Sequence, residues 1–244
     1  MRLIQLTDCH LHADPAARSR TGLPHRQLAR VIEAAAALRP DRVLVTGDVS
    51  EDRSAASYEL AHRLLSAFGC PWAWLPGNHD EPAAMAACRA FDASLDLGAR
   101  RLLLLDTQCP GREDGELGEA RLAELAARLA GDARPTLIAM HHPPLAVGSA
   151  WMDALRLSDA GAFWKVLAGQ DHVEAVFCGH IHQAFLGRGP AEAGGIPVHG
   201  CPATSDQFLP GAEHFTVDEA SRPGFRVIDL RGEAIETWIE RVEV

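Results

Sequence analysis

The sequence has no excess of basic residues, no paired-cysteine pattern and no long hydrophobic run. Its formal net charge is −10 and its pI is near 5.6, which argues against a groove that follows a nucleic-acid backbone. The six cysteines form no C-x-x-C pair, so we expect reduced thiols rather than a disulfide framework. Apolar runs such as Leu102–Leu105 are far too short to cross a bilayer. These absences predict no membrane span and no nucleic-acid polymer as a partner.

The chain shows no repeat, no low-complexity tract and no linker that would divide it. With 244 residues, of which 47% are hydrophobic, it can bury one sizeable core, and we expect a single domain over residues 1–244. The first expected strand begins almost at Met1, which predicts that no signal peptide precedes it. We therefore expect a cytoplasmic protein.

Short β-branched or aliphatic runs alternate with helical patterns over most of the chain. The runs predict strands at Leu3–Thr7, Val43–Thr46, Trp72–Leu75, Leu102–Leu105, Thr136–Met140 and Ala175–Cys178. The intervening patterns predict helices at Arg26–Leu38, Ala55–Phe68, Pro82–Phe91, Leu117–Leu129 and Asp159–Leu167. Near the end, Phe225–Leu230 and Ala234–Arg241 indicate a β-hairpin around a glycine-containing turn. This order predicts an α/β fold of two packed sheets with outer helices.

Polar motifs follow five of the expected strands, each where the strand ends. They are Asp8-Cys9-His10, Gly47-Asp48, Gly77-Asn78-His79-Asp80, His141-His142 and Gly179-His180-Ile181-His182. Ligands of open α/β sheets gather outside the carboxyl ends of the strands, so we expect these side chains in one cleft. Strand alternation would direct Asp8 and His10 to the same side and Cys9 away from it.

The residue types in these motifs suit two divalent transition metals beside a phosphate ester. Mixed carboxylate and imidazole ligands favour Fe, Mn or Zn over magnesium or calcium. Two metals about 3.5–4 Å apart can share a carboxylate and lower the pKa of a water toward neutrality. Because Asn78 and the histidines add no negative charge, such a site stays positive and can bind a phosphodiester monoanion. His79 is then expected to be catalytic, stabilising or protonating the leaving oxygen.

The motifs resemble the pattern of the calcineurin-like metallophosphoesterase superfamily, which is D-x-H, G-D, G-N-H-D/E, H and G-H-x-H. Every position is occupied between Asp8 and His182. The resemblance implies the metallophosphoesterase fold, a four-layer αββα sandwich of two mixed β-sheets. It implies one metal held by Asp8, His10, Asp48 and His182, and a second held by Asp48, Asn78, His141 and His180. We also expect the substrate to contact Asn78, His79 and His182.

Further stretches resemble the bacterial class III cyclic-nucleotide phosphodiesterases and extend over nearly the whole chain. They include Leu75–Asp80, Leu104–Gln108, Gly115–Leu117, Trp151–Asp153, Cys178–Gln183, Gln207–Phe208 and Phe225–Val227. This resemblance implies a metal-dependent phosphodiesterase that opens 3′,5′-cyclic AMP to 5′-AMP. A broader enzyme that cleaves glycerophosphodiesters is the alternative. A metal-poor protein scaffold is disfavoured, since neither a ligand position nor His79 is missing.

Four points stay open at the level of the sequence. For His142 we favour packing or support of a ligand over ligation itself. Asp80 either orients His79 or caps the helix that begins near Pro82. Residues Trp151–Asp153 line the substrate pocket, form a subunit contact or pack internally. The expected partner is a small-molecule phosphodiester, and a homodimer is an alternative to a monomer.

Overall fold

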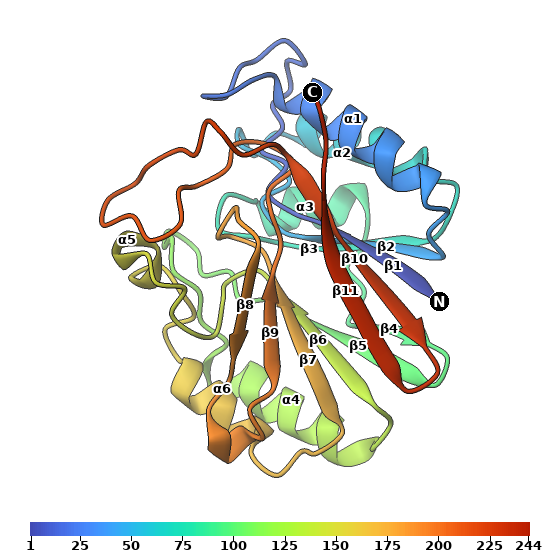
Figure 1. Ribbon diagram of the computed structural model, residues 1–244, viewed down its shortest axis with the longest axis vertical. Coiled ribbons are helices and arrows are strands. Elements are labelled where there is room, and N and C mark those ends of the chain that lie inside the picture. The colour runs from blue at the N-terminus through green and yellow to red at the C-terminus, as the bar shows by residue number, and fades with distance from the viewer.

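The computed structural model describes residues 1–244, in which two mixed β-sheets lie face to face between layers of helices (Figure 1). The first sheet has the strand order β11-β10-β1-β2-β3. β1, β2 and β3 are parallel, whereas β10 is antiparallel to both β1 and β11. Their bounds are β1 Arg2–Leu6, β2 Arg42–Thr46, β3 Trp72–Leu75, β10 Gly224–Arg231 and β11 Ala234–Arg241.

The second sheet has the strand order β4-β5-β6-β7-β9-β8. β5, β6, β7 and β9 are parallel, and the two edge strands β4 and β8 run antiparallel to their neighbours. Their bounds are β4 Ser94–Leu97, β5 Arg100–Leu105, β6 Thr136–Met140, β7 Val173–Cys178, β8 Phe185–Arg188 and β9 Pro197–Gly200. Each sheet therefore contains neighbouring parallel strands whose carboxyl ends lie at the same edge.

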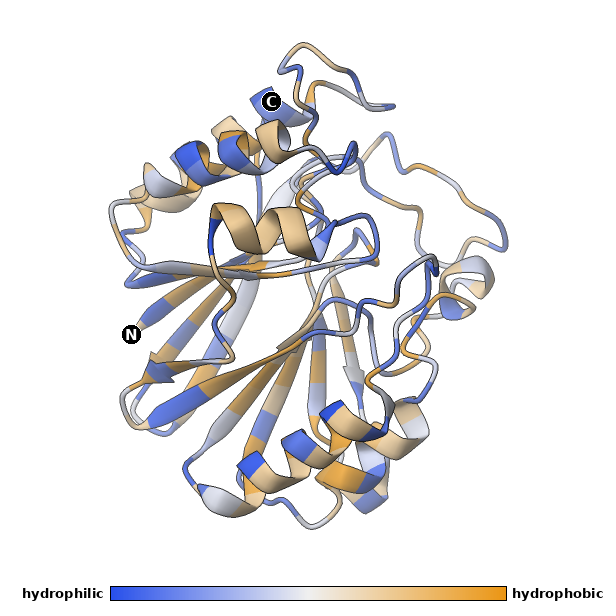
Figure 2. Ribbon diagram, turned by 180° about the vertical axis from the view of Figure 1, so that it is seen from behind, coloured by the Kyte–Doolittle hydropathy of each residue, from blue (hydrophilic) through white to orange (hydrophobic).

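The helices cover the outer faces of the sheets, and polar and apolar residues alternate along them (Figures 1 and 2). α1 (Pro24–Ala37), α2 (Ala55–Ser66) and α3 (Pro82–Cys88) pack on the first sheet. α4 (Gly118–Gly131) and α6 (Ala160–Leu167) pack on the second. Two shorter helices, α5 (Ala150–Asp153) and the 3₁₀ helix η1 (Ala191–Ala193), lie in connections. No helix combines the length and the apolar character that crossing a membrane requires.

Three hydrophobic clusters occupy the spaces between these four layers. The middle cluster joins the inner faces of the two sheets and includes Leu3, Leu44, Leu137 and Phe177. The outer clusters join each sheet to its own helices. The predicted four-layer αββα sandwich of two mixed sheets is thus confirmed.

All the strands and helices expected from the sequence are present, with ends that differ by a few residues. α1 starts earlier than expected, at Pro24, because proline at the first helical position loses no intrahelical hydrogen bond. α3 ends at Cys88 rather than Phe91 because Arg89 is extended. β4, β8, β9 and α5 were not expected. β8 and β9 are four residues long and contain Gly187, Pro197 or Gly200, so neither has a periodic pattern to detect.

Candidate metal centre

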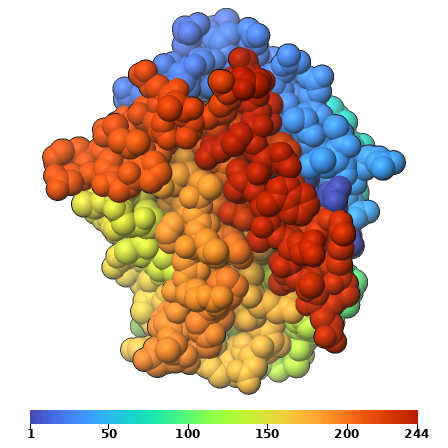
Figure 3. Space-filling view, in the orientation of Figure 1, coloured from blue at the N-terminus to red at the C-terminus, as the bar shows by residue number.

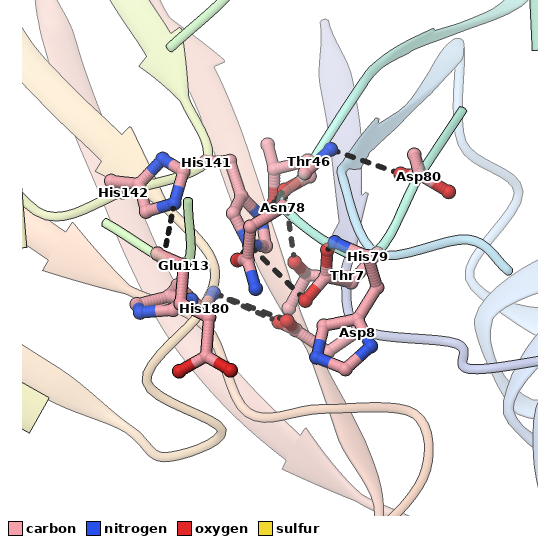
Figure 4. Close-up of polar contacts among 12 residues, drawn as sticks. Thr7, Asp8, Thr46, Asn78, His79, Asp80, Glu113, His141, His142 and His180 are labelled. Carbon is pink, nitrogen blue, oxygen red and sulfur yellow. Dashed lines mark hydrogen bonds and ion pairs between the residues drawn. The ribbon is translucent and has the colours of Figure 1, made fainter. Parts of the chain in front are cut away.

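The five polar motifs lie in loops just beyond the carboxyl ends of β1, β2, β3, β6 and β7. Since β1, β2 and β3 belong to one sheet and β6 and β7 to the other, both sheets contribute to a single site. Figure 4 shows Asp8, Asn78, His79, His141 and His180 directed toward one another from these loops.

The backbone of the site is unusual in its positive φ angles. The chain has seven non-glycine residues with positive φ, and five of them are expected metal ligands: Asp8, His10, Asp48, His180 and His182. The strand β1 ends at Leu6, so strand alternation does not orient Asp8 and His10; that premise was wrong. Left-handed turns orient them instead. Such strained residues persist where the surrounding structure determines them, and they cluster at functional sites.

Two glycines let the loops approach one another closely. A Cβ on Gly77 would collide with Asp48 of the neighbouring loop and with the ring of His141, which follows a strand of the second sheet. A Cβ on Gly179 would meet Thr7 Oγ1 and would come within 2.8 Å of Thr46 O. Glycine at both positions therefore permits the close packing of loops from the two sheets.

One group of ligand atoms comprises those of Asp8, His10, Asp48 and His182, all within 4.8 Å of one another. His182 Nε2 lies 3.2 Å from Asp8 Oδ1 and 3.2 Å from His10 Nε2. His10 Nε2 lies 3.8 Å from Asp48 Oδ2. These are the residues that the sequence assigned to the first metal.

The second expected group surrounds His141. Its Nε2 lies 3.3 Å from Asp48 Oδ2 and 3.1 Å from Asn78 Oδ1. The ring of His180 is 5.1 Å from that of His141, and its buried Nε2 has no hydrogen-bond partner. Asp48 Oδ2 thus faces both groups, as a shared ligand must.

The hydrogen bonds of three histidines show that the site suits cations. The Nδ1 atoms of His141 and His182 each lie 2.7 Å from a backbone oxygen, that of Thr46 or of Asp206. His10 Nδ1 lies 2.7 Å from Glu51 Oε2. If each Nδ1 carries the proton, every Nε2 presents a lone pair to the centre, where it faces another acceptor. Only protons or metal cations can reconcile these facing acceptors, so the donor set fits two metals.

The pKa shifts within the cluster also indicate a site that suits cations. Burial lowers the pKa of both His10 and His141. In His10 the hydrogen bond to Glu51 and the charge of Asp48 together outweigh burial, and in His141 the interaction with the charged Asp48 does, so that the pKa of each rises to about 9. The pKa of Asp48 is lowered by the imidazolium of His141 despite burial. Buried carboxylates here require nearby positive charge, which protons supply when metals do not.

Glu51 is a site residue that the sequence reasoning missed. Its Oε2 lies 2.7 Å from His10 Nδ1 and 3.0 Å from His79 Nδ1. It therefore orients both rings and leaves His79 Nε2 free. The available signal was a carboxylate three residues after Asp48 on the same loop. The backbone oxygens of Asn78 and His79 accept hydrogen bonds from Arg53, which was also missed.

Asp80 has neither of the roles considered for it. Its carboxylate accepts hydrogen bonds from the backbone N–H groups of Val49, Ser50 and Gly77 and from the Tyr58 hydroxyl. It caps no helix. Burial and the charge of Asp48 raise the pKa of Asp80 to about 6. Through these hydrogen bonds, Asp80 links the loop that carries Asp48 to the loop that carries Asn78.

His142 and Trp151–Asp153 have packing roles. His142 Nδ1 bonds to Thr107 Oγ1 at 2.8 Å, and its Nε2 lies 3.2 Å from Glu113 O, so neither nitrogen is free for a metal. Burial and His141 lower its pKa to about 3. Trp151 packs against aromatic rings, Met152 is buried, and Asp153 accepts a hydrogen bond from Val147 N.

Comparisons with known proteins bear on the family and the fold of the chain. The family model described as calcineurin-like phosphoesterase matches residues 1–184. The chain is 36% identical to the 3′,5′-cyclic adenosine monophosphate phosphodiesterase CpdA of Pseudomonas aeruginosa, over 99% of this chain and 90% of that protein. It is 35% identical to the Escherichia coli K12 protein of the same name, over 97% and 88%. A solved dimetal phosphatase from Danio rerio has a TM-score of 0.75 over 99% of both chains at 13% identity, a likeness of fold alone.

Proposed function

The chain belongs to the calcineurin-like phosphoesterase family, and we propose that it is a two-metal phosphodiesterase that hydrolyses 3′,5′-cyclic AMP to 5′-AMP. The observation that carries the proposal is the 35–36% identity, over nearly the full chain, to proteins named for that reaction. The clustered ligand atoms support it, because two-metal sites suit in-line displacement at phosphorus.

In the proposed site, Asp8, His10, Asp48 and His182 hold one metal. Asp48, Asn78, His141 and His180 hold the other. The mixed nitrogen and oxygen donors suit Mn, Fe or Zn. When bound, such metals supply positive charge against the phosphoryl oxygens and make a water acidic enough to react near neutral pH. Asn78 and the histidines carry no negative charge, so as ligands they do not neutralise the positive charge of the metals.

The residues of the chain then bind and orient the diester. Asn78, His79 and His182 are the proposed contacts, and the side chain of His79 is 39% exposed beside the cluster. Glu51 holds His79 Nδ1, which leaves Nε2 to donate a proton to the ribose 3′ oxygen as its bond to phosphorus breaks. Burial opposes the charge on His79, yet its bond to Glu51 raises its pKa above the usual value. The acidic form of His79 therefore persists to a higher pH than that of an ordinary imidazole.

A comparison of substrates tests the proposal. We expect the metal-reconstituted protein to convert cyclic AMP to 5′-AMP with a higher kcat/KM than it shows for glycerophosphodiesters or for phosphomonoesters. The measurement is product analysis by chromatography with full kinetics for each substrate. A glycerophosphodiester preferred by more than roughly 100-fold, about 2.7 kcal/mol of transition-state discrimination, would assign the broader diesterase activity instead.

Metal content provides a second test. We expect about two transition-metal ions per chain, because Asp48 belongs to the cluster with Asp8, His10 and His182 and also faces His141 Nε2 at 3.3 Å. Dialysis against EDTA should abolish turnover, and Mn, Fe or Zn should restore it. Elemental analysis and activity are measured on the same samples. Full activity with only trace metal, unchanged by EDTA, is the contrary result.

A further inference from the structure

A cavity of about 560 Å³ opens beside the metal centre and extends well past the ligand atoms. His10, His79 and His182 form one part of its lining, and Phe208 and Phe215 form another. Its volume lies in the range of ordinary small-molecule sites. The cavity is therefore large enough for more of the substrate than its phosphate.

The aromatic part of the cavity packs directly against a candidate metal ligand. The ring of Phe208 stacks on that of His182, with centroids 3.9 Å apart and planes at 12°. Phe215 meets Phe208 edge to face at 5.2 Å, and Trp151 packs against both. We call Phe208 and Phe215 the aromatic wall. Phe215 is 46% exposed, so the wall presents a ring to the cavity.

The segment that carries the aromatic wall is held at both ends. Its two arms pair through Leu209 N to Thr216 O at 2.9 Å and through Asp218 N to Gln207 O at 2.8 Å. At its tip, Gly211 N donates to Ser149 Oγ at 2.9 Å. This segment, orange-red in Figures 1 and 3, protrudes beside α5. These contacts hold Phe215 in place.

A cation lies over the exposed ring. The guanidinium carbon of Arg20 is 4.8 Å from the centroid of Phe215. The loop that contains Arg20 is held in place by Asp206. The Asp206 carboxylate accepts hydrogen bonds from Ser19 Oγ at 2.7 Å, Arg20 N at 3.0 Å and Thr21 N at 2.9 Å. The backbone oxygen of Asp206 also bonds His182 Nδ1. One residue thus sets the position of Arg20 relative to the metal centre.

We propose that Phe215 and Arg20 form the subsite that stacks the purine base of the substrate while its cyclic phosphate lies at the metal centre. The proposal takes the identity of the substrate from the proposed function. Flat bases stack on aromatic rings and on guanidinium planes whatever their hydrogen-bonding edge. A glycerophosphodiester has no such ring, so this subsite favours nucleotides over the aliphatic diesters that the metal centre alone would accept.

Binding of two products separates the base from the phosphate. We compare 5′-AMP with ribose 5-phosphate, which lacks the base, by calorimetry on the Mn-reconstituted protein. The wild type should bind 5′-AMP at least about 10-fold more tightly, within the range that one base–aromatic stack contributes. Phe215→Ala should lose that advantage while its affinity for ribose 5-phosphate stays unchanged. Phe215→Trp should keep the advantage, and Arg20→Ala should lose part of it.

Phe91→Ala is the matched control, since Phe91 is 37% exposed and lines a different cavity. It should leave both affinities unchanged. The subsite is refuted if the wild type binds the two ligands equally, if Phe215→Ala binds 5′-AMP normally, or if both ligands weaken in parallel. Failure to hydrolyse cyclic AMP, with the preference for 5′-AMP intact, would refute the proposed function and leave the subsite standing.

Discussion

Replacing Asp48 by asparagine should lower kcat for the diester by more than about 10³-fold and reduce the metal content below two per chain. Asp48 Oδ2 faces His141 Nε2 at 3.3 Å and His10 Nε2 at 3.8 Å, so a single carboxylate serves both groups. An amide has one oxygen acceptor and no charge, and it leaves the facing imidazoles without a counter-ion. Elemental analysis and kinetics on the same preparation measure both effects.

Asp229→Asn is the matched control for this variant. Asp229 is also a buried aspartate, 3% exposed, and it pairs with Arg2 at the opposite end of β1. Its loss should lower the thermal midpoint while two metals and turnover are retained. Equal metal loss in both variants would show that general destabilisation, rather than a shared ligand, explains the effect of Asp48.

The positions of the candidate ligands could be predicted because each follows a periodic element. Strand patterns placed Asp8, Asp48, Asn78, His141 and His180 at carboxyl ends, and parallel strands bring such ends to one edge of a sheet. The order of elements also indicated two packed sheets. The strand order of the second sheet could not be predicted, because β9 lies between β7 and β8 although it follows both in the chain.

The supporting contacts could not be predicted because they join residues with no common pattern. Glu51 reaches His10 across 41 residues of sequence, and Asp206 reaches His182 from an irregular segment. The left-handed turns at Asp8 and His10 depend on the loops packed around them rather than on local propensity. The sequence therefore located the candidate ligands, whereas the orientation of each ring could be seen only in the fold.

Asp80 illustrates the same limit in a single residue. Its place two residues before Pro82 and next to His79 left two local roles open, a helix cap or the orientation of His79. The structure instead places its carboxylate under two loops, where it accepts hydrogen bonds from Val49 N and Gly77 N. Only tertiary packing brings those donors together. A buried polar residue is thus placed by the donors around it, which the sequence alone does not specify.

Replacing His79 by alanine should lower kcat for cyclic AMP by ~10²–10⁴-fold, the usual contribution of a positioned acid, with metal content unchanged. The side chain of His79 is bonded to Glu51, and the backbone N–H of His79, which donates to Asp48 Oδ1, is retained in the alanine variant, so both proposed ligand groups stay complete. The raised pKa of His79 keeps the acid protonated to a higher pH than usual. Activity of the wild type should therefore fall as pH rises through that pKa, and His79→Ala should lack this fall.

The leaving group gives the sharper distinction for His79. A ribose alkoxide is a poor leaving group that needs a proton, whereas p-nitrophenolate leaves without one. His79→Ala should therefore be strongly impaired on cyclic AMP and only weakly impaired on bis(p-nitrophenyl) phosphate, as kinetics on both substrates will measure. Equal losses on the two substrates would mean that His79 stabilises charge on the phosphoryl group instead of protonating the leaving oxygen. Metal loss in this variant would mean that Glu51 and His79 together hold His10 in place, since the two histidines share the Glu51 carboxylate.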